Sequence, residues 1–211
     1  MDCRMTKTYS GLVHLNGNVM AAVDFETTGR RAGFHEPIQI AIVALDSELR
    51  PLTGVRPFYH EIKPKYPERA EGDASSVHKI DLEQLRLHAA SADRIADLLI
   101  EWWEKLDLPF EKKLVPLAHN WPFENSFFRA WLGSDLTDKL FHGHARDAMS
   151  YAISLNDRAA FKGEPVPFPK VGLGSLCKRF KVINAQPHDA MCDALAEAEL
   201  YRNMLHYDLA A

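Results

Sequence analysis

An apolar run near the start of the chain ends in acidic residues. Residues 19–24 (VMAAVD) are predicted to form a buried β-strand, and Asp24 at its end is followed by Phe25 and Glu26. Successive strand residues point to opposite faces, so Asp24 and Glu26 are expected to stand side by side. Two like charges this close repel each other unless something positive lies between them. The pattern therefore predicts a positive partner at this point.

The remaining pattern predicts further strands and then helices. Residues 37–46 and 56–64 complete a three-stranded meander, and residues 112–120 form a strand that runs into a loop. Helices are predicted over residues 81–106, 123–133, 147–155, 173–182 and 189–206. In the last helix, the residues expected to face the core are Ala190, Ala194, Leu195, Ala198, Tyr201 and Leu205. This order of elements indicates a single mixed α/β domain.

Composition excludes several classes of protein. The 211 residues hold no apolar run of the length that a membrane span requires, and the N-terminus has no apolar signal segment. The three cysteines form no CxxC pair, which favours a reducing, cytoplasmic location. The net charge of 25 − 29 = −4 does not favour a nucleic-acid binder. Divalent cations held by site carboxylates would offset that charge.

Two other places supply acidic residues that complement the first pair. Glu124 begins a predicted helix directly after a strand, and His188 and Asp193 lie where a loop joins the last helix. Strand ends and helix starts are where α/β folds build their sites. Converging carboxylates suit Mg²⁺ or Mn²⁺. Two such ions clamp the attacking and leaving oxygens in phosphodiester hydrolysis, and a nearby histidine can accept the proton of the water.

The motifs carry a resemblance to a known family. The sequence contains DFETTG at residues 24–29, ASSVHKI at 74–80, AHNWPFE at 118–124 and HDAMCDA at 188–194. In their order and spacing, they resemble the motifs of the DEDDh-type 3′–5′ exonucleases, the family of proofreading exonuclease subunits and RNase T. The resemblance covers residues 18–206. It implies one exonuclease domain over residues 18–211, preceded by an extension of residues 1–17.

The resemblance implies a fold and a set of site residues. The fold would be α/β and RNase H-like, with a five-stranded mixed sheet flanked by helices. Two divalent metal ions, Mg²⁺ or Mn²⁺, would be held by Asp24, Glu26, Glu124 and Asp193. His188 would be the general base. Residues near the terminal nucleotide would be Phe25, Thr27, Thr28, His78, His119, Asn120 and Phe123.

One motif position departs from the family pattern. Glu124 stands where the family has aspartate, which moves the carboxylate outward by ~1.5 Å. Three interpretations stay open: an adjusted active site, an altered metal preference, or a degenerate site. The last would make the chain a catalytically weakened module that binds nucleic acid or a polymerase.

The expected activity is metal-dependent 3′–5′ hydrolysis of single-stranded DNA or RNA, releasing nucleoside 5′-monophosphates. The sequence does not distinguish DNA from RNA, and a polymerase partner or a homodimer is compatible with it. A basic cluster could steer a phosphate backbone or could equally be the solvated side of a helix. It consists of Lys162, Lys170, Lys178, Arg179 and Lys181.

Overall fold

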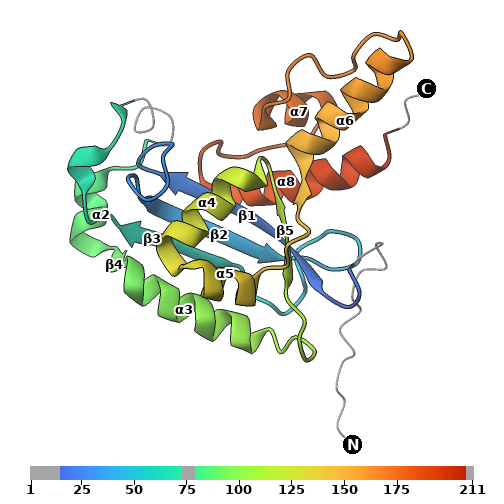
Figure 1. Cartoon of the computed structure of the whole chain (residues 1–211). Coiled ribbons are helices and arrows are strands. Elements are labelled where there is room, and N and C mark those ends of the chain that lie inside the picture. Colours follow the sequence, from blue (N-terminus) through green and yellow to red (C-terminus); the bar gives the residue numbers. More distant parts are fainter. Residues whose placement is uncertain (1–14, 73–78, 208–211) are drawn as a thin grey trace, which may run out of the picture.

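A mixed six-stranded sheet forms the centre of the molecule. The computed structural model describes residues 15–72 and 79–207. In the sheet order β4-β3-β2-β1-β5-β6, strand β1 is antiparallel to β2 and parallel to β5 (Figure 1). The strands are β1 (Val19–Thr27), β2 (Pro37–Ala44), β3 (Phe58–Lys63), β4 (Ala90–Ser91), β5 (Leu114–Ala118) and β6 (Arg146–Asp147). The predicted fold class is confirmed. The sheet has six strands rather than the expected five, and the strand at each edge has only two residues.

Helices cover both faces of the sheet. Helices α3, α4 and α5 lie on one face, and α8 lies on the other with α6 and α7 beside it (Figure 1). The helices are η1 (Pro67–Arg69), α2 (Leu82–His88), α3 (Ala92–Lys105), α4 (Trp121–Leu132), α5 (Ser134–Leu140), α6 (Ala148–Phe161), α7 (Leu173–Phe180) and α8 (Ala190–Leu205). Within the described residues, no helix combines the length and apolar character needed to cross a membrane.

Strand β1 divides the core into two clusters. Val19, Ala21, Val23 and Phe25 point to the face covered by α3 and α4. Met20 and Ala22 point to the face covered by α8. Because side chains alternate along a strand, Asp24 and Glu26 continue the α8 face. The strand runs on to Thr27, past its predicted end at residue 24, so both acidic residues lie within the sheet.

The helix predicted over residues 81–106 is two helices. Residues Ala90–Ser91 leave the helical path and pair with Ile62–Lys63 of β3 as the short parallel strand β4. The Ser91 hydroxyl accepts a hydrogen bond from the Arg94 backbone N–H, which caps the start of α3. The apolar periodicity continues across the break, which is why the pattern alone predicted one helix.

The orientation of α8 also differs from the prediction. Leu195 and Leu205 are 38% and 42% exposed, so their assignment to the core is wrong. Glu197 and Met204 are buried in their place. Small alanines bring α8 close to the sheet, and this packing, rather than the placement of leucines, sets which face is buried.

The folded chain includes residues ahead of the predicted domain start. Leu15 is fully buried in the core on the α8 side. The Asn18 side chain donates to the Leu15 carbonyl at 2.7 Å and accepts from the Lys113 N–H at 2.7 Å. Residues 1–14 of the predicted extension lie outside the described residues.

Candidate metal centre

The end of β1 places two carboxylates under the start of α8. Glu26 is 8% exposed, and one oxygen of Asp24, Oδ2, is buried without a hydrogen-bond partner among the described residues. Burial, followed by the charges of Asp193 and Asp189, raises the pKa of Glu26 to about 8. Burial also raises the pKa of Asp24 well above its ordinary value. Among the described residues, no positively charged side chain is a cause of either pKa shift.

The N-terminus of α8 is fixed to the sheet by hydrogen bonds. The Gln39 Oε1 atom on β2 accepts from the Ala190 N–H at 2.9 Å. The Asp189 side chain caps the helix by accepting from the Cys192 N–H at 3.0 Å. Asp193, one turn into α8, accepts from the Asn184 side chain and, at 3.1 Å, from the His188 N–H. These bonds orient the Asp193 carboxylate toward β1.

Three predicted site residues meet at this junction. Glu26, His188 and Asp193 each offer a ligand atom, and these atoms lie within 4.8 Å of one another. No other group of three such residues with this spacing occurs in residues 15–72 and 79–207. His188 is exposed and has a φ of 66°, a conformation that residues other than glycine rarely adopt. Carboxylate ligands suit Mg²⁺ and Mn²⁺, so Glu26 and Asp193 fit such a cation with His188 beside it.

Glu124 lies in the first turn of α4, next to the ends of β1 and β5. Its side chain is 4% exposed, and its Oε2 atom has no hydrogen-bond partner among the described residues. Burial raises the pKa of Glu124 well above its ordinary value, and the charge of Asp147 adds to this. Asp147 itself accepts from the Trp121 N–H and the Ser150 N–H, at 2.6 and 2.7 Å, and so ties α4 to α6.

The structure adds an acidic residue that the sequence analysis did not single out. Glu197 on α8 is 1% exposed, and its Oε1 atom accepts from the His119 N–H at 3.0 Å. Burial and then the charges of Glu124 and Asp193 raise its pKa. The available signal was its position four residues after Asp193, which places both on one helix face.

Most residues of the DFETTG turn are buried or hydrogen-bonded within the fold. Phe25 is 5% exposed and lies in the aromatic cluster opposite the acidic face, and its contact with a nucleotide stays a prediction. Thr28 has no exposed surface, and its hydroxyl accepts from the Glu36 N–H at 2.9 Å, so it is a turn residue. Thr27 donates to the Gly29 carbonyl at 2.8 Å, and its role near the nucleotide stays a prediction.

Residues of the AHNWPFE motif lie partly at the site and partly in its surroundings. His119 follows β5 at the level of the acidic residues, and burial lowers its pKa. Asn120 is exposed with a φ of 88°, and Phe123 packs on Phe127 with ring centroids 4.9 Å apart. His78 lies outside the described residues. Contacts of these residues with a nucleotide stay predictions.

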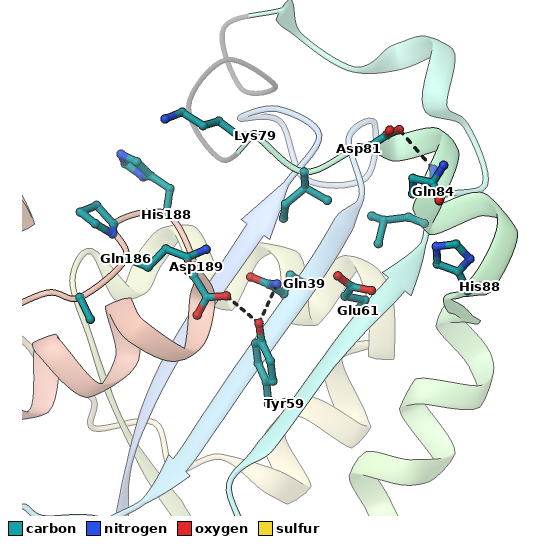
Figure 2. A pocket seen from close by; sticks show the side chains of 14 residues that line it. Gln39, Tyr59, Glu61, Lys79, Asp81, Gln84, His88, Gln186, His188 and Asp189 are labelled. Carbon is teal, nitrogen blue, oxygen red and sulfur yellow. Dashed lines mark hydrogen bonds between the residues drawn. The ribbon is translucent and has the colours of Figure 1, made fainter.

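A cavity of about 720 Å³ opens beside His188. Its floor is formed by β2 and β3, and its walls are α2 and the loop before α8 (Figure 2). The Tyr59 hydroxyl donates to Asp189 at 2.6 Å and accepts from the Gln39 side chain at 3.0 Å. These two hydrogen bonds link β2 and β3, at the floor of the cavity, to Asp189, which follows His188.

Comparisons with known proteins support the fold. The profile of a family named RNase T and described as exonuclease matches residues 21–201. No curated protein matches the sequence. Among solved structures, exonuclease I from Methylocaldum szegediense has a TM-score of 0.69 and 20% identity, covering 90% of this chain and 41% of that one. E. coli exonuclease I in complex with a dT13 oligonucleotide has a TM-score of 0.65 and 18% identity, covering 88% and 40%.

A shorter neighbour is the 3′-exonuclease in a structure of histone mRNA stem-loop recognition. Its TM-score is 0.63 at 15% identity, with 90% of this chain and 64% of that chain covered. At such identities the structures establish the fold. The chain spans less than half the length of the exonuclease I chains, 41% in the case of Methylocaldum szegediense.

Proposed function

Because the chain belongs to the RNase T exonuclease family, we propose that it is a metal-dependent 3′–5′ exonuclease acting on single-stranded nucleic acid. The observation that carries this proposal is the meeting of Glu26, His188 and Asp193 within 4.8 Å at the end of β1. The buried, unpartnered oxygens of Asp24 and Glu124 beside them support the presence of cations.

Each site residue has a role in the proposed reaction. Asp24, Glu26, Glu124 and Asp193 would hold two divalent cations, Mg²⁺ or Mn²⁺. When bound, such cations polarise the scissile phosphate and lower the pKa of the attacking water. His188, on the exposed side of the group, takes the proton of that water. The water oxygen bonds to the terminal phosphorus as the bond to the preceding 3′ oxygen breaks. That 3′ oxygen takes a proton from solvent, and a nucleoside 5′-monophosphate leaves.

Nucleic acid as the substrate is supported by the structural neighbours. Exonuclease I has been solved in complex with dT13 and dA16 oligonucleotides, and another neighbour is a 3′-exonuclease of histone mRNA. The exposed basic cluster on α7 and the loop before it could contact the backbone of either polymer. It consists of Lys162, Lys170, Lys178, Arg179 and Lys181.

The proposal is tested by digesting a 5′-labelled single-stranded DNA and a matched RNA with Mg²⁺ or Mn²⁺. We expect a ladder that shortens from the 3′ end, abolished by EDTA. Asp24→Asn should lower the rate by about 10³-fold, since the electrostatic contribution of a metal site is several kcal/mol. Glu48→Gln, which changes an exposed charge remote from the site, is the matched control. Cleavage that persists in EDTA or in Asp24→Asn would contradict the proposal.

Glu124 motivates a second candidate, a weakened module that binds nucleic acid without cleaving it. Its test is Glu124→Asp, which restores the family residue. Activity in this variant, with none in the wild type, would favour the binding module. A polymerase partner, a homodimer and a cytoplasmic location stay predictions.

A further inference from the structure

Glu197 is a buried acid that the motif-based site leaves without a role. It lies on α8 one turn beyond Asp193 and is 1% exposed. Its Oε1 atom accepts the His119 N–H at 3.0 Å, and its Oε2 atom is buried with no hydrogen-bond partner in the described part of the chain. A backbone acceptor alone does not account for an acid here, because a neutral amide would accept the same bond at a lower desolvation cost.

The surroundings of Glu197 indicate where its free oxygen points. Strands β1 and β5 are parallel, and Ala22 pairs with Leu117. Asp24 and His119 each lie two residues further along, so the same register places them side by side. Glu197, bonded to His119, is therefore held beside Asp24. After burial, Glu197 is the strongest of the charged neighbours that raise the pKa of Asp24, ahead of Glu124.

Glu124, on α4, is a third buried acid near Asp24. Its Oε2 atom is also buried and unpartnered among the described residues, as is Oδ2 of Asp24. Three carboxylates, from β1, α4 and α8, thus each have one buried oxygen without a hydrogen-bond partner among the described residues. Buried acidic groups of this kind are paired, protonated or bound to a cation.

We propose that Glu197 is a fifth carboxylate of the metal centre and that, with Glu124, it supplies oxygen ligands to a divalent cation next to Asp24. The proposal rests on the metal dependence in the proposed function. In such a centre, Glu197 on α8 would add an oxygen ligand beside the longer side chain of Glu124.

The test is calorimetric titration of the full chain with Mn²⁺, without nucleic acid. Glu197→Gln keeps an oxygen for the His119 N–H but removes the charge. We expect its Mn²⁺ affinity to fall by about 10- to 100-fold, the range for groups that support a metal site. Glu199→Gln, on the same helix and paired with Arg202 at 3.9 Å, should leave the affinity unchanged.

Thermal unfolding gives a second, independent measurement. In EDTA, Glu197→Gln should raise the unfolding midpoint because it removes a buried acid whose ionisation burial and the neighbouring carboxylates oppose. With Mn²⁺, the variant should gain less stability than the wild type. Glu124→Gln combined with Glu197→Gln should weaken Mn²⁺ binding by less than the product of the single effects, because both residues contact one ion.

Several results would overturn the inference. Wild-type Mn²⁺ affinity in Glu197→Gln would make Glu197 a backbone acceptor only, while the exonuclease proposal stands. A lower midpoint in EDTA would likewise indicate a structural role. If Glu197→Gln does not fold, Glu197→Asp keeps the charge, and wild-type affinity in that shortened variant would count against a ligand. A wild-type protein that binds no Mn²⁺ would overturn this inference together with the proposed function.

Discussion

The two faces of β1 differ sharply although they belong to one strand. On one face, Phe25 packs against Phe128 with ring centroids 4.6 Å apart, and Phe127 and Trp131 complete the surroundings. On the other face, Asp24 and Glu26 adjoin the acids of α8. On the aromatic face, the rings pack against one another. On the acidic face, buried oxygens have no hydrogen-bond partners among the described residues.

The difference separates the residues that stabilise the fold from those proposed to hold cations. Burying an aromatic ring stabilises the fold by several kcal/mol, whereas crowding ionised carboxylates opposes folding. The aromatic face therefore holds β1 in place against the repulsion on its reverse side. Substitutions on the two faces should give opposite results, and the predictions below run from the largest expected effect to the smallest.

Phe128→Ala should lower the free energy of unfolding by about 3–5 kcal/mol, because it leaves a cavity in a fully buried cluster. Chemical denaturation measures this, and Mn²⁺ affinity of the folded protein should stay unchanged. Phe161→Ala is the control, since that side chain is 95% exposed. An equal loss of stability in both variants would show that the aromatic cluster is not the source of stability.

His188→Gln should lower the single-turnover rate by about 10²- to 10³-fold, the contribution of a general base. Stability should change little, because the side chain is exposed. Substrate binding, measured by fluorescence anisotropy in Ca²⁺, should be retained, and His206→Gln serves as the control. A rate within a factor of about two of wild type would exclude His188 as the base.

Stability of the metal-free protein should fall as the pH rises. Glu26 has its pKa raised from 4.5 to about 8, so the folded state holds a proton that the unfolded chain has lost. This stabilisation is full below pH 4.5 and is lost as the pH rises through about 8. Between pH 6 and 9 we expect the unfolding midpoint in EDTA to fall by roughly 5 °C.

Glu26→Gln is the matched variant for that measurement, because it removes the titrating group and should flatten the profile. Saturating Mn²⁺ should reduce the slope in the wild type by holding the carboxylates ionised. A midpoint in EDTA that does not depend on pH would contradict the account of the acidic face.

Tyr59→Phe should have the smallest effect. It removes the hydroxyl that joins Asp189 to Gln39, a net contribution of about 1 kcal/mol. We expect a fall in kcat of less than about tenfold, with Mn²⁺ affinity unchanged, because only the position of the His188 loop is loosened. Loss of Mn²⁺ binding would show that Tyr59 supports the centre directly.

The sequence predicted the parts of the site that depend on local rules. Strand alternation placed Asp24 and Glu26 on one face, and helix-start signals placed Asp193 and Glu124 in the first turns of their helices. These features require only a few neighbouring residues. The fold class followed from the order of the elements and from the resemblance.

Glu197 could not be identified in this way, because its burial depends on how α8 rotates against the sheet. An acid among alanines normally lies on a solvated face, and Leu195 and Leu205 suggested a different core side. The break at Ala90–Ser91 likewise depends on pairing with β3, which is distant in sequence. Packing between remote segments decided both outcomes.

The hydrogen bond from the Ala190 N–H to Gln39 joins residues 151 positions apart and has a consequence for synthesis of the protein. The acidic residues of α8 lie beside β1 only once α8 has packed onto the sheet. A chain emerging from the ribosome, which folds from its N-terminus, therefore has the first half of the centre long before the second. Until residues 190–205 emerge, the growing polypeptide lacks the α8 half of the candidate metal centre.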